Sequence, residues 1–356
     1  MTSIGASRLS AECSDSKLTA PNSISKMNTL SKVAAIWNEI DEASEDQRID
    51  NYLLKTLKGV PKSHVYRVLR SGEVRVNSGR VQADYRLRRG DKVRIPPMRI
   101  GATLSNALPQ ASSKALLQAN VLYEDEHLLA LDKPAGMAVH GGSGICLGVI
   151  EQLRAERPDA KFLELVHRLD RDTSGCLLIA KKRRALIAMH AALRDGRMEK
   201  RYLALVKGEW SKKKLKIELA LHKFVNSEGE RRVVVHDDGQ AAITLITLRQ
   251  SWQECSLLGV QLKTGRTHQI RVHLAHLGHP IAGDDKYGDF SWNRELARNG
   301  AKRMFLHAES LTLMHPESGA KLNLVSQMPA PMQVFVSALG GPLQGNFDSP
   351  QKISEP

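Results

Sequence analysis

The stretch V-H-R-L-D-R-D-T-S-G-C-L-L-I-A-K, residues 166–181, decides the organisation of this sequence. Three residues that handle protons or anions, His167, Arg168 and Asp170, precede a Thr-Ser-Gly turn, and an apolar run at residues 176–180 follows it. A short apolar run beside a turn predicts a buried strand. Because a buried strand holds its flanking loop rigidly, the charged residues of this loop are candidates for a functional site. An ordinary surface loop beside a core strand is the alternative interpretation.

The order H-R-L-D-x-x-T-S-G within this stretch resembles the catalytic signature of the RluA/RluC/RluD group of pseudouridine synthases. The resemblance implies that Asp170 is the essential carboxylate of such an enzyme. The sister small-subunit group typically has Gly at the position of His167, so the sequence favours the first group. Residues 131–144, L-D-K-P-A-G-M-A-V-H-G-G-S-G, resemble the RluC subgroup more than the RluD subgroup.

Two later segments resemble further motifs of the same family. Residues 200–204 read K-R-Y-L-A and are similar to its K-x-Y-x-A segment, and residues 265–273 read G-R-T-H-Q-I-R-V-H. By this resemblance, Tyr202 stacks on the target base, Arg168 fills the space that the flipped base vacates, and Arg266 pairs with the catalytic carboxylate. Without the resemblance, a half-buried strand tyrosine is the favoured interpretation of Tyr202.

The implied chemistry is the isomerisation of uridine in RNA. Stacking hides the reacting atoms of a uridine in folded RNA, so an enzyme must flip the nucleotide out and hold it. The N-glycosidic bond is cleaved, the uracil rotates, and a carbon–carbon glycosidic bond forms. Because nothing is oxidised and no outside group is added, we expect neither a cofactor nor a metal. A desolvated carboxylate tends to become neutral, and a neighbouring arginine would keep Asp170 ionised.

The positive charge of the chain is concentrated in one segment. The formal net charge is +14 and the isoelectric point is near 9.7. Residues 48–99 contain fourteen Lys and Arg against four Asp and Glu, so this segment alone carries +10. Such a concentration indicates a nucleic-acid-binding module rather than a generally basic surface.

The same segment resembles the S4 RNA-binding domain. Apolar residues recur at helical spacing before Gly59 and again after Pro61, and residues 73–77 alternate like a strand. R-I-D-N-Y-L-L at residues 48–54, followed by G-E-V-R-V-N at residues 72–77, carries the resemblance. The candidate RNA-binding residues are Arg48, Lys62, Arg67, Arg70, Arg75, Arg80, Arg88 and Arg89.

We therefore expect an α+β protein with two domains, the second built on a mostly antiparallel mixed sheet with flanking helices. The expected parts are a disordered leader (1–45), an S4-like RNA-binding domain (46–100), a linker (101–120), a pseudouridine synthase catalytic domain (121–338) and a loose tail (339–356). The leader and the linker are predicted from their small polar residues and the lack of any helical or strand period. Within the leader, residues 33–40 are either a short edge strand or part of the disordered segment.

Four histidines, at positions 268, 273, 276 and 279, raise the alternative of a zinc site. Only His273 and His276 share a helical face, and no cysteine or carboxylate completes a known ligand spacing. We therefore predict no metal. The four cysteines of the chain (Cys13, Cys146, Cys176 and Cys255) are scattered, which predicts reduced thiols, with Cys176 a small core residue.

Three functions from different classes fit parts of the sequence. The favoured one is a pseudouridine synthase acting on large-subunit ribosomal RNA, with the same chemistry at another RNA site as its nearest alternative. A glycoside hydrolase would need a carboxylate pair, but Asp170 and Asp172 are only two residues apart, with Arg171 between them. A non-catalytic S4 RNA-binding protein would not need the catalytic motifs.

The expected partner is large-subunit ribosomal RNA. No apolar run is long enough for a membrane span, and the first residues lack the apolar core of a signal peptide. We expect a cytoplasmic monomer that has no membrane partner.

Overall fold

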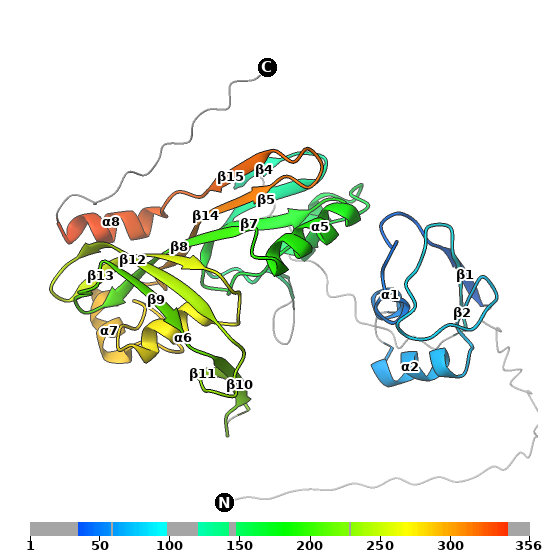
Figure 1. Ribbon diagram of the computed structural model, residues 1–356, viewed down its shortest axis with the longest axis horizontal. Coiled ribbons are helices and arrows are strands. Elements are labelled where there is room, and N and C mark those ends of the chain that lie inside the picture. The colour runs from blue at the N-terminus through cyan, green and yellow to red at the C-terminus, as the bar shows by residue number, and fades with distance from the viewer. Residues whose placement is uncertain (1–34, 58–59, 98–119, 142–146, 228, 341–356) are drawn as a thin grey trace, which may run out of the picture.

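The computed structural model describes residues 35–57, 60–97, 120–141, 147–227 and 229–340 (Figure 1). A small N-terminal domain, drawn in blue, is followed by a larger α+β domain that runs from green to red in the figure. Most of the predicted leader and linker, and most of the predicted tail, lie outside the described residues. Within those ranges, no helix is long and apolar enough to cross a membrane.

The small domain packs two helices on a three-stranded antiparallel sheet of order β1-β3-β2. Its elements are β1 (Ile36–Glu39), α1 (Ile49–Thr56), α2 (Lys62–Arg70), β2 (Arg75–Val76) and β3 (Lys92–Ile95). Strand β1 lies in the segment assigned to the leader, and it is the short edge strand that the sequence allowed within residues 33–40. Ile40, directly after β1, is buried in the core of this domain.

The large domain is built on one ten-stranded sheet. Its strands are β4 (Val121–Glu124), β5 (Leu128–Lys133), β6 (Glu164–Leu165), β7 (Ser174–Ala180), β8 (Glu199–Lys207), β9 (Lys214–Glu218), β12 (Ile243–Ser251), β13 (Cys255–Leu262), β14 (Leu306–Met314) and β15 (Lys321–Val325). The main path runs β4-β5-β7-β14-β8-β13-β12-β9, with β6 beside β7 and β15 beside β14. The described pairing of β7 with β14 is parallel and the others are antiparallel, which confirms the expected mixed sheet.

Helices cover this sheet on both sides, and a separate hairpin projects from it (Figure 1). The helices are α4 (Val149–Glu156), α5 (Arg183–Arg194), α6 (Gln269–His276), α7 (Phe290–Arg298) and α8 (Ala330–Ala338), and the hairpin consists of β10 (Leu221–Val225) and β11 (Arg231–Val235). Helix α7 was not expected from the sequence, although Asp289 is a side-chain cap that accepts hydrogen bonds from the backbone N–H groups of Ser291 and Trp292.

Strand β7 is buried along its whole length, as its apolar run predicted. Successive side chains of a strand point to opposite faces, so both faces of β7 must be covered. Leu177 and Ile179 belong to one apolar cluster, while Cys176, Leu178 and Ala180 belong to the other. The loop that precedes β7 is therefore anchored to a fully packed strand.

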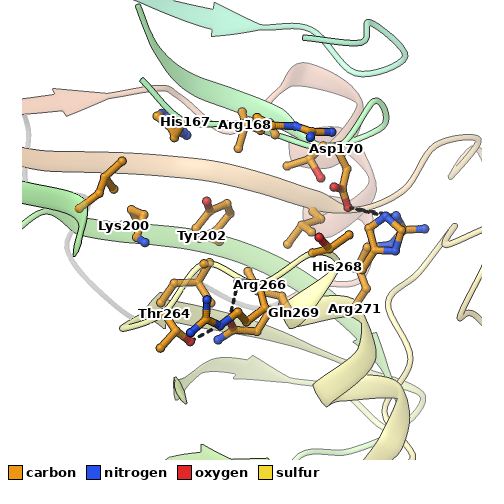
Figure 2. A pocket seen from close by; sticks show the side chains of 18 of the residues that line it. His167, Arg168, Asp170, Lys200, Tyr202, Thr264, Arg266, His268, Gln269 and Arg271 are labelled. Carbon is orange, nitrogen blue, oxygen red and sulfur yellow. Dashed lines mark hydrogen bonds and ion pairs between the residues drawn. The ribbon is translucent and has the colours of Figure 1, made fainter. Parts of the chain in front are cut away.

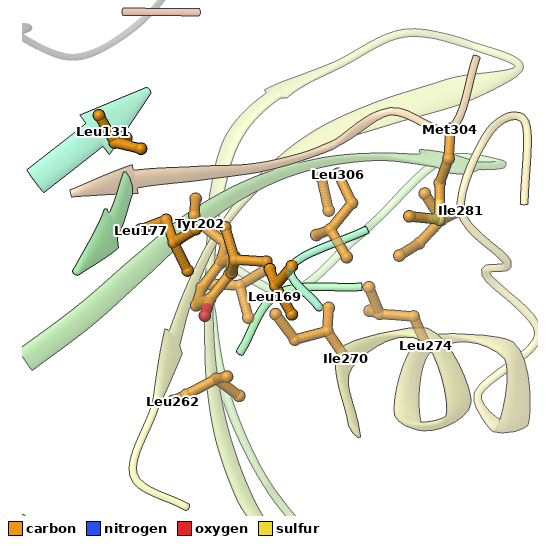
Figure 3. Packing of buried hydrophobic residues seen from close by; sticks show 14 of the residues in the cluster. Leu131, Leu169, Leu177, Tyr202, Leu262, Ile270, Leu274, Ile281, Met304 and Leu306 are labelled. Carbon is orange, nitrogen blue, oxygen red and sulfur yellow. The ribbon is translucent and has the colours of Figure 1, made fainter. Parts of the chain in front are cut away.

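The first of these clusters forms the floor beneath the candidate site (Figure 3). Leu169, from the loop before β7, packs in the same cluster as Tyr202 of β8 and Ile270 of α6. Segments far apart in the sequence thus meet through buried side chains. Because Leu169 and Ile270 pack together, the charged residues next to them in the sequence lie close to one another.

The second residue of β7, Gly175, lies where the backbone leaves no room for a side chain. Its φ is +108°, and a Cβ at this position would lie 2.2 Å from the carbonyl oxygen of Ala308, its parallel partner on β14. We expect Gly175→Ala to lower the free energy of unfolding by about 3 kcal/mol or more, because backbone strain of roughly 1 to 3 kcal/mol is joined by a backbone clash.

Denaturant unfolding with Gly196→Ala as the matched control tests this prediction. Gly196 also has a positive φ, of 68°, but a Cβ there meets nothing within 4 Å, so its substitution should cost only about 1 kcal/mol. Equal losses in the two variants would contradict the close approach of β7 to β14.

Candidate active site

The four predicted catalytic residues line one pocket. Asp170, Arg168, Tyr202 and Arg266 lie around a cavity of about 580 Å³ (Figure 2). Its walls come from the loop before β7, from β8, and from the loop at residues 263–268 with the start of α6. Asp172 does not line this pocket, and its carboxylate accepts hydrogen bonds from the guanidinium of the adjacent Arg171.

Asp170 is paired with Arg271, not with Arg266. Nη1 of Arg271 donates to Oδ2 of Asp170 at 3.1 Å. Arg266 instead donates from Nε to the backbone carbonyl of Ala241 at 3.1 Å, although its side chain also lines the pocket. The prediction that Arg266 pairs with Asp170 is wrong, because Arg266 precedes α6 while Arg271 lies on the helix and faces the carboxylate (Figure 2).

Asp284 holds Arg271 in place. This carboxylate is fully buried and accepts two hydrogen bonds of 2.7 Å from Nε and Nη2 of Arg271. Its Oδ1 also accepts the backbone N–H groups of Lys286 and Tyr287. Burial opposes both charges, but the hydrogen bonds and mutual attraction lower the pKa of Asp284 and raise that of Arg271.

Sequence reasoning did not identify Asp284 as a site residue. The available signal was its place in the turn H-P-I-A-G-D at residues 279–284, which follows α6 directly. A bidentate pair between arginine and carboxylate fixes both distance and orientation. Asp284 therefore positions the guanidinium that meets Asp170.

His268 lies beside the carboxylate without a close contact. Its Nε2 is 3.9 Å from Oδ2 of Asp170, and its Nδ1 is 2.8 Å from the hydroxyl of Tyr287. The residue has a φ of 53° and forms the turn into α6. Burial lowers its pKa, which favours the neutral imidazole.

Tyr202 forms the floor of the pocket. Its ring is 7% exposed and packs in the cluster that contains Leu169 and Ile270. Burial, and then the charge of Asp170, raise the pKa of its hydroxyl, so the phenol stays neutral. Arg168 lies on the opposite wall and is exposed (Figure 2). The pocket thus combines an apolar aromatic surface, a carboxylate and an exposed guanidinium.

Lys133 supports the loop that carries Asp170. Its ammonium group is fully buried and donates to the carbonyls of Pro134, Met137 and Arg171 at 2.8 to 2.9 Å. Desolvation lowers its pKa to about 7. Because Arg171 directly follows Asp170, these three hydrogen bonds, the Lys133 cradle, join the turn after β5 to the loop that carries Asp170.

We expect Lys133→Met to lower the free energy of unfolding by roughly 2 kcal/mol. The carbonyls of Pro134 and Met137 lose their donor, at about 1 kcal/mol or more each, whereas the carbonyl of Arg171 still accepts the backbone N–H of Gly136. Turnover should fall at least tenfold while the KM for RNA changes little, because the loop moves but the RNA-binding charges remain. Lys302→Met removes an exposed ammonium group and serves as the control. A Lys133 variant that turns over normally would show that the cradle is dispensable.

Three of the four histidines considered for zinc, His268, His273 and His279, have other partners in the structure. His273 lies within hydrogen-bond distance of Thr244 Oγ1 and of the carbonyl of Leu219, and His279 contacts the carbonyl of Lys207. A different group, Asp125, His127 and His315, brings three possible ligand atoms within 4.8 Å of one another.

The contacts of His315 indicate that this group links the β4–β5 hairpin to the β14–β15 hairpin. Nδ1 of His315 accepts the backbone N–H groups of Glu317 and Ser318, which leaves the proton of the neutral ring on Nε2. That nitrogen lies 2.7 Å from Oδ2 of Asp125, in the turn between β4 and β5. The contact joins the β4–β5 turn to the turn after β14.

The candidate RNA-binding residues of the small domain are exposed. This holds for all eight: Arg48, Lys62, Arg67, Arg70, Arg75, Arg80, Arg88 and Arg89. Arg48 is held by a bidentate contact with buried Asp50. Polar contacts with the larger domain include an ion pair of Lys55 with Glu164 at 3.0 Å and a hydrogen bond from Arg183 to the carbonyl of Glu45.

Family models match both domains. Residues 127–276 match the RNA pseudouridylate synthase family, and residues 47–93 match the S4 domain. Among solved structures, Human RNA Pseudouridylate Synthase Domain Containing 4 superposes with a TM-score of 0.54 at 25% identity, covering 64% of this chain and 95% of its own. Human RNA Pseudouridylate Synthase Domain Containing 1, at 23% identity and a TM-score of 0.52, shares the fold and covers 67% of this chain and 100% of its own.

Curated relatives cover most of the chain. The Ribosomal large subunit pseudouridine synthase C of Pasteurella multocida is 49% identical over 304 residues, which is 84% of this chain and 92% of that protein. The protein of the same name from Escherichia coli strain K12 is 50% identical over 300 residues, or 83% of this chain and 93% of its own. The resemblance drawn from the motifs is confirmed: the chain belongs to the RNA pseudouridylate synthase family and carries an S4 domain ahead of its catalytic domain.

Proposed function

We propose that this chain isomerises uridines of large-subunit ribosomal RNA to pseudouridine in the cytoplasm, with Asp170 as the catalytic carboxylate. The observation that carries the proposal is the pairing of Asp170 with Arg271 at the edge of a pocket floored by Tyr202. The names of its relatives support the large-subunit substrate. The exposed basic residues of the S4 domain would bind RNA phosphate.

The two oxygens of Asp170 have different surroundings. Oδ2 accepts from Arg271, whereas Oδ1 has no hydrogen-bond partner among the described residues. The ion pair fixes the orientation of the carboxylate. Oδ1 is then the oxygen that meets the flipped nucleotide.

The other pocket residues would hold that nucleotide. A flipped base loses its stacking neighbours, and an aromatic surface replaces them at about 1 to 3 kcal/mol per base. Tyr202 offers that surface beside the carboxylate. Arg168, exposed on the facing wall, would occupy the gap that the base leaves in the RNA. Arg266 would contact RNA from the loop before α6, since its side chain lines the pocket.

Tritium release from ribosomal RNA labelled at C5 of uridine tests the proposal, because only isomerisation at that carbon frees the label. Large-subunit RNA without pseudouridine should release tritium with the wild-type protein, and small-subunit RNA should not. Release from small-subunit RNA alone would overturn the substrate, and release from neither would overturn the function. A hydrolase would free uracil instead of pseudouridine.

A further inference from the structure

The lining of the active-site pocket carries an excess of positive charge. Six lining residues are cationic, and Asp170 is the single carboxylate among the lining residues. The six are Arg168, Arg194, Lys200, Lys263, Arg266 and Arg271. Arg271 is already neutralised by Asp170, Asp284 and Asp285, so the remaining cations face the cavity without an acidic partner among its lining.

Lys200 is the most enclosed of these uncompensated cations. It is half-buried on β8, and within the described ranges its ammonium group has neither a hydrogen bond nor an ion pair. A Cβ built on Gly265 would lie 3.5 Å from its Nζ, so the group rests against the loop that carries Arg266. Its other close neighbour, His167, is neutral, because desolvation and the charge of Lys200 lower the His167 pKa to about 4.

A partly desolvated ammonium group without an acceptor is stabilised by a bound anion. Burial lowers the pKa of Lys200, and no carboxylate in the described part of the chain opposes that effect. A neutral carbonyl would satisfy one N–H but would not offset the lost hydration of the charge, whereas a phosphate oxygen does both. An anionic group of the substrate would therefore give Lys200 both an acceptor and an opposite charge.

The position of Lys200 on β8 indicates which anionic group of the RNA it would contact. Lys200 and Tyr202 are two residues apart on one strand, so their side chains share a face and stand roughly 7 Å apart. Figure 2 shows Tyr202 between Lys200 and the Asp170–Arg271 pair. If a base stacks on Tyr202, the phosphates on either side of its own nucleotide lie close enough for the ammonium group of Lys200 to reach one of them.

We propose that Lys200 binds a backbone phosphate that flanks the flipped uridine, and so forms an anion subsite at the end of the pocket remote from Asp170. The inference rests on the proposed function for the identity of the nucleotide. It assigns to Lys200 the task of holding the RNA strand while the base and the sugar react at Asp170.

The test compares Lys200→Met, Lys200→Arg and wild type on an RNA hairpin that contains a uridine modified by the wild-type protein. We expect Lys200→Met to weaken RNA binding by about 10- to 100-fold, as for a lost charge-assisted hydrogen bond. The slope of log Kd against log salt should fall by about 0.7, the value for one phosphate contact on a single strand. Lys200→Arg should keep the slope. Lys321→Met, which removes an exposed ammonium on β15, should change neither quantity.

Methylphosphonate groups placed one at a time around the target uridine locate the phosphate. One position should weaken binding to wild type by the same factor as Lys200→Met and have no effect on that variant. Weaker binding with an unchanged salt slope would overturn the phosphate assignment and favour a base carbonyl. Wild type that is insensitive at every position would overturn it even if Lys200→Met does not fold. Absence of pseudouridine with wild type contradicts the proposed function instead, and the salt slope then still tests Lys200.

Discussion

Asp170→Asn should abolish pseudouridine formation while the protein remains folded and binds RNA. The amide keeps the size of the carboxylate but is a poor nucleophile and a poor base. We expect turnover to fall by about 10⁴-fold or more, the range found when a catalytic nucleophile is removed. Tritium release under single-turnover conditions measures this loss, because it isolates the chemical step.

The fold should tolerate the change. Asp170 is about one-third exposed, and its partner Arg271 keeps both hydrogen bonds to Asp284. The lost ion pair should therefore cost about 1 kcal/mol or less. RNA binding should stay the same or tighten slightly, since a negative charge near phosphate is removed.

Asp172→Asn is the matched control. Asp172 is two residues away in the same loop, carries the same charge, and faces Arg171 rather than the pocket. Its substitution should leave turnover within a few-fold of wild type. If both variants are folded and equally inactive, the single-carboxylate mechanism is wrong and the two-carboxylate alternative returns.

Much of the site could be predicted because its positions depend on strong local patterns. The apolar run of β7 predicts a buried strand, and that strand fixes the loop with Arg168 and Asp170. The alternation around Tyr202 predicts β8, which places this side chain on the face of the sheet that lines the pocket. The period of each element predicts the strands, whereas the resemblance of the motifs to the family assigns Arg168, Asp170 and Tyr202 to the site.

The partner of Asp170 could not be obtained in this way. Arg266 and Arg271 lie in one motif, and the choice between them depends on where the helix begins. His268 takes a left-handed conformation, and the side chain of Gln269 accepts the backbone N–H of Arg266, so the chain turns sharply before α6. That turn directs Arg266 to the carbonyl of Ala241, a detail that residue types do not encode.

A weak pattern left strand β1 undecided in the sequence. Strand β1 has a largely exposed pattern and is only four residues long, so neither alternation nor burial marks it. It is held by its pairing with β3, more than fifty residues later in the chain. Contacts of this kind are tertiary, and composition assigned the segment to the leader instead.

Arg271→Met should be the most damaging single change to the site as a whole. It removes the donor that orients Asp170 and leaves the carboxylate of Asp284, fully buried, without its charge partner. Removing one member of a buried ion pair costs about 3 to 5 kcal/mol. The loss of a preorganised charged donor at the reacting group should also lower kcat by on the order of 10² to 10³.

The double variant Arg271→Met with Asp284→Asn separates these two effects. It removes both charges, so no unpaired carboxylate stays buried, and we expect it to recover a substantial part of the lost stability in denaturant unfolding. Turnover should not recover, because Asp170 still lacks its donor. Arg266→Met, which does not touch the ion pair, should keep the stability of wild type and act mainly on RNA affinity. If Arg266→Met instead lowers kcat as strongly as the double variant does, the pairing of Asp170 with Arg271 is not the one that catalysis uses.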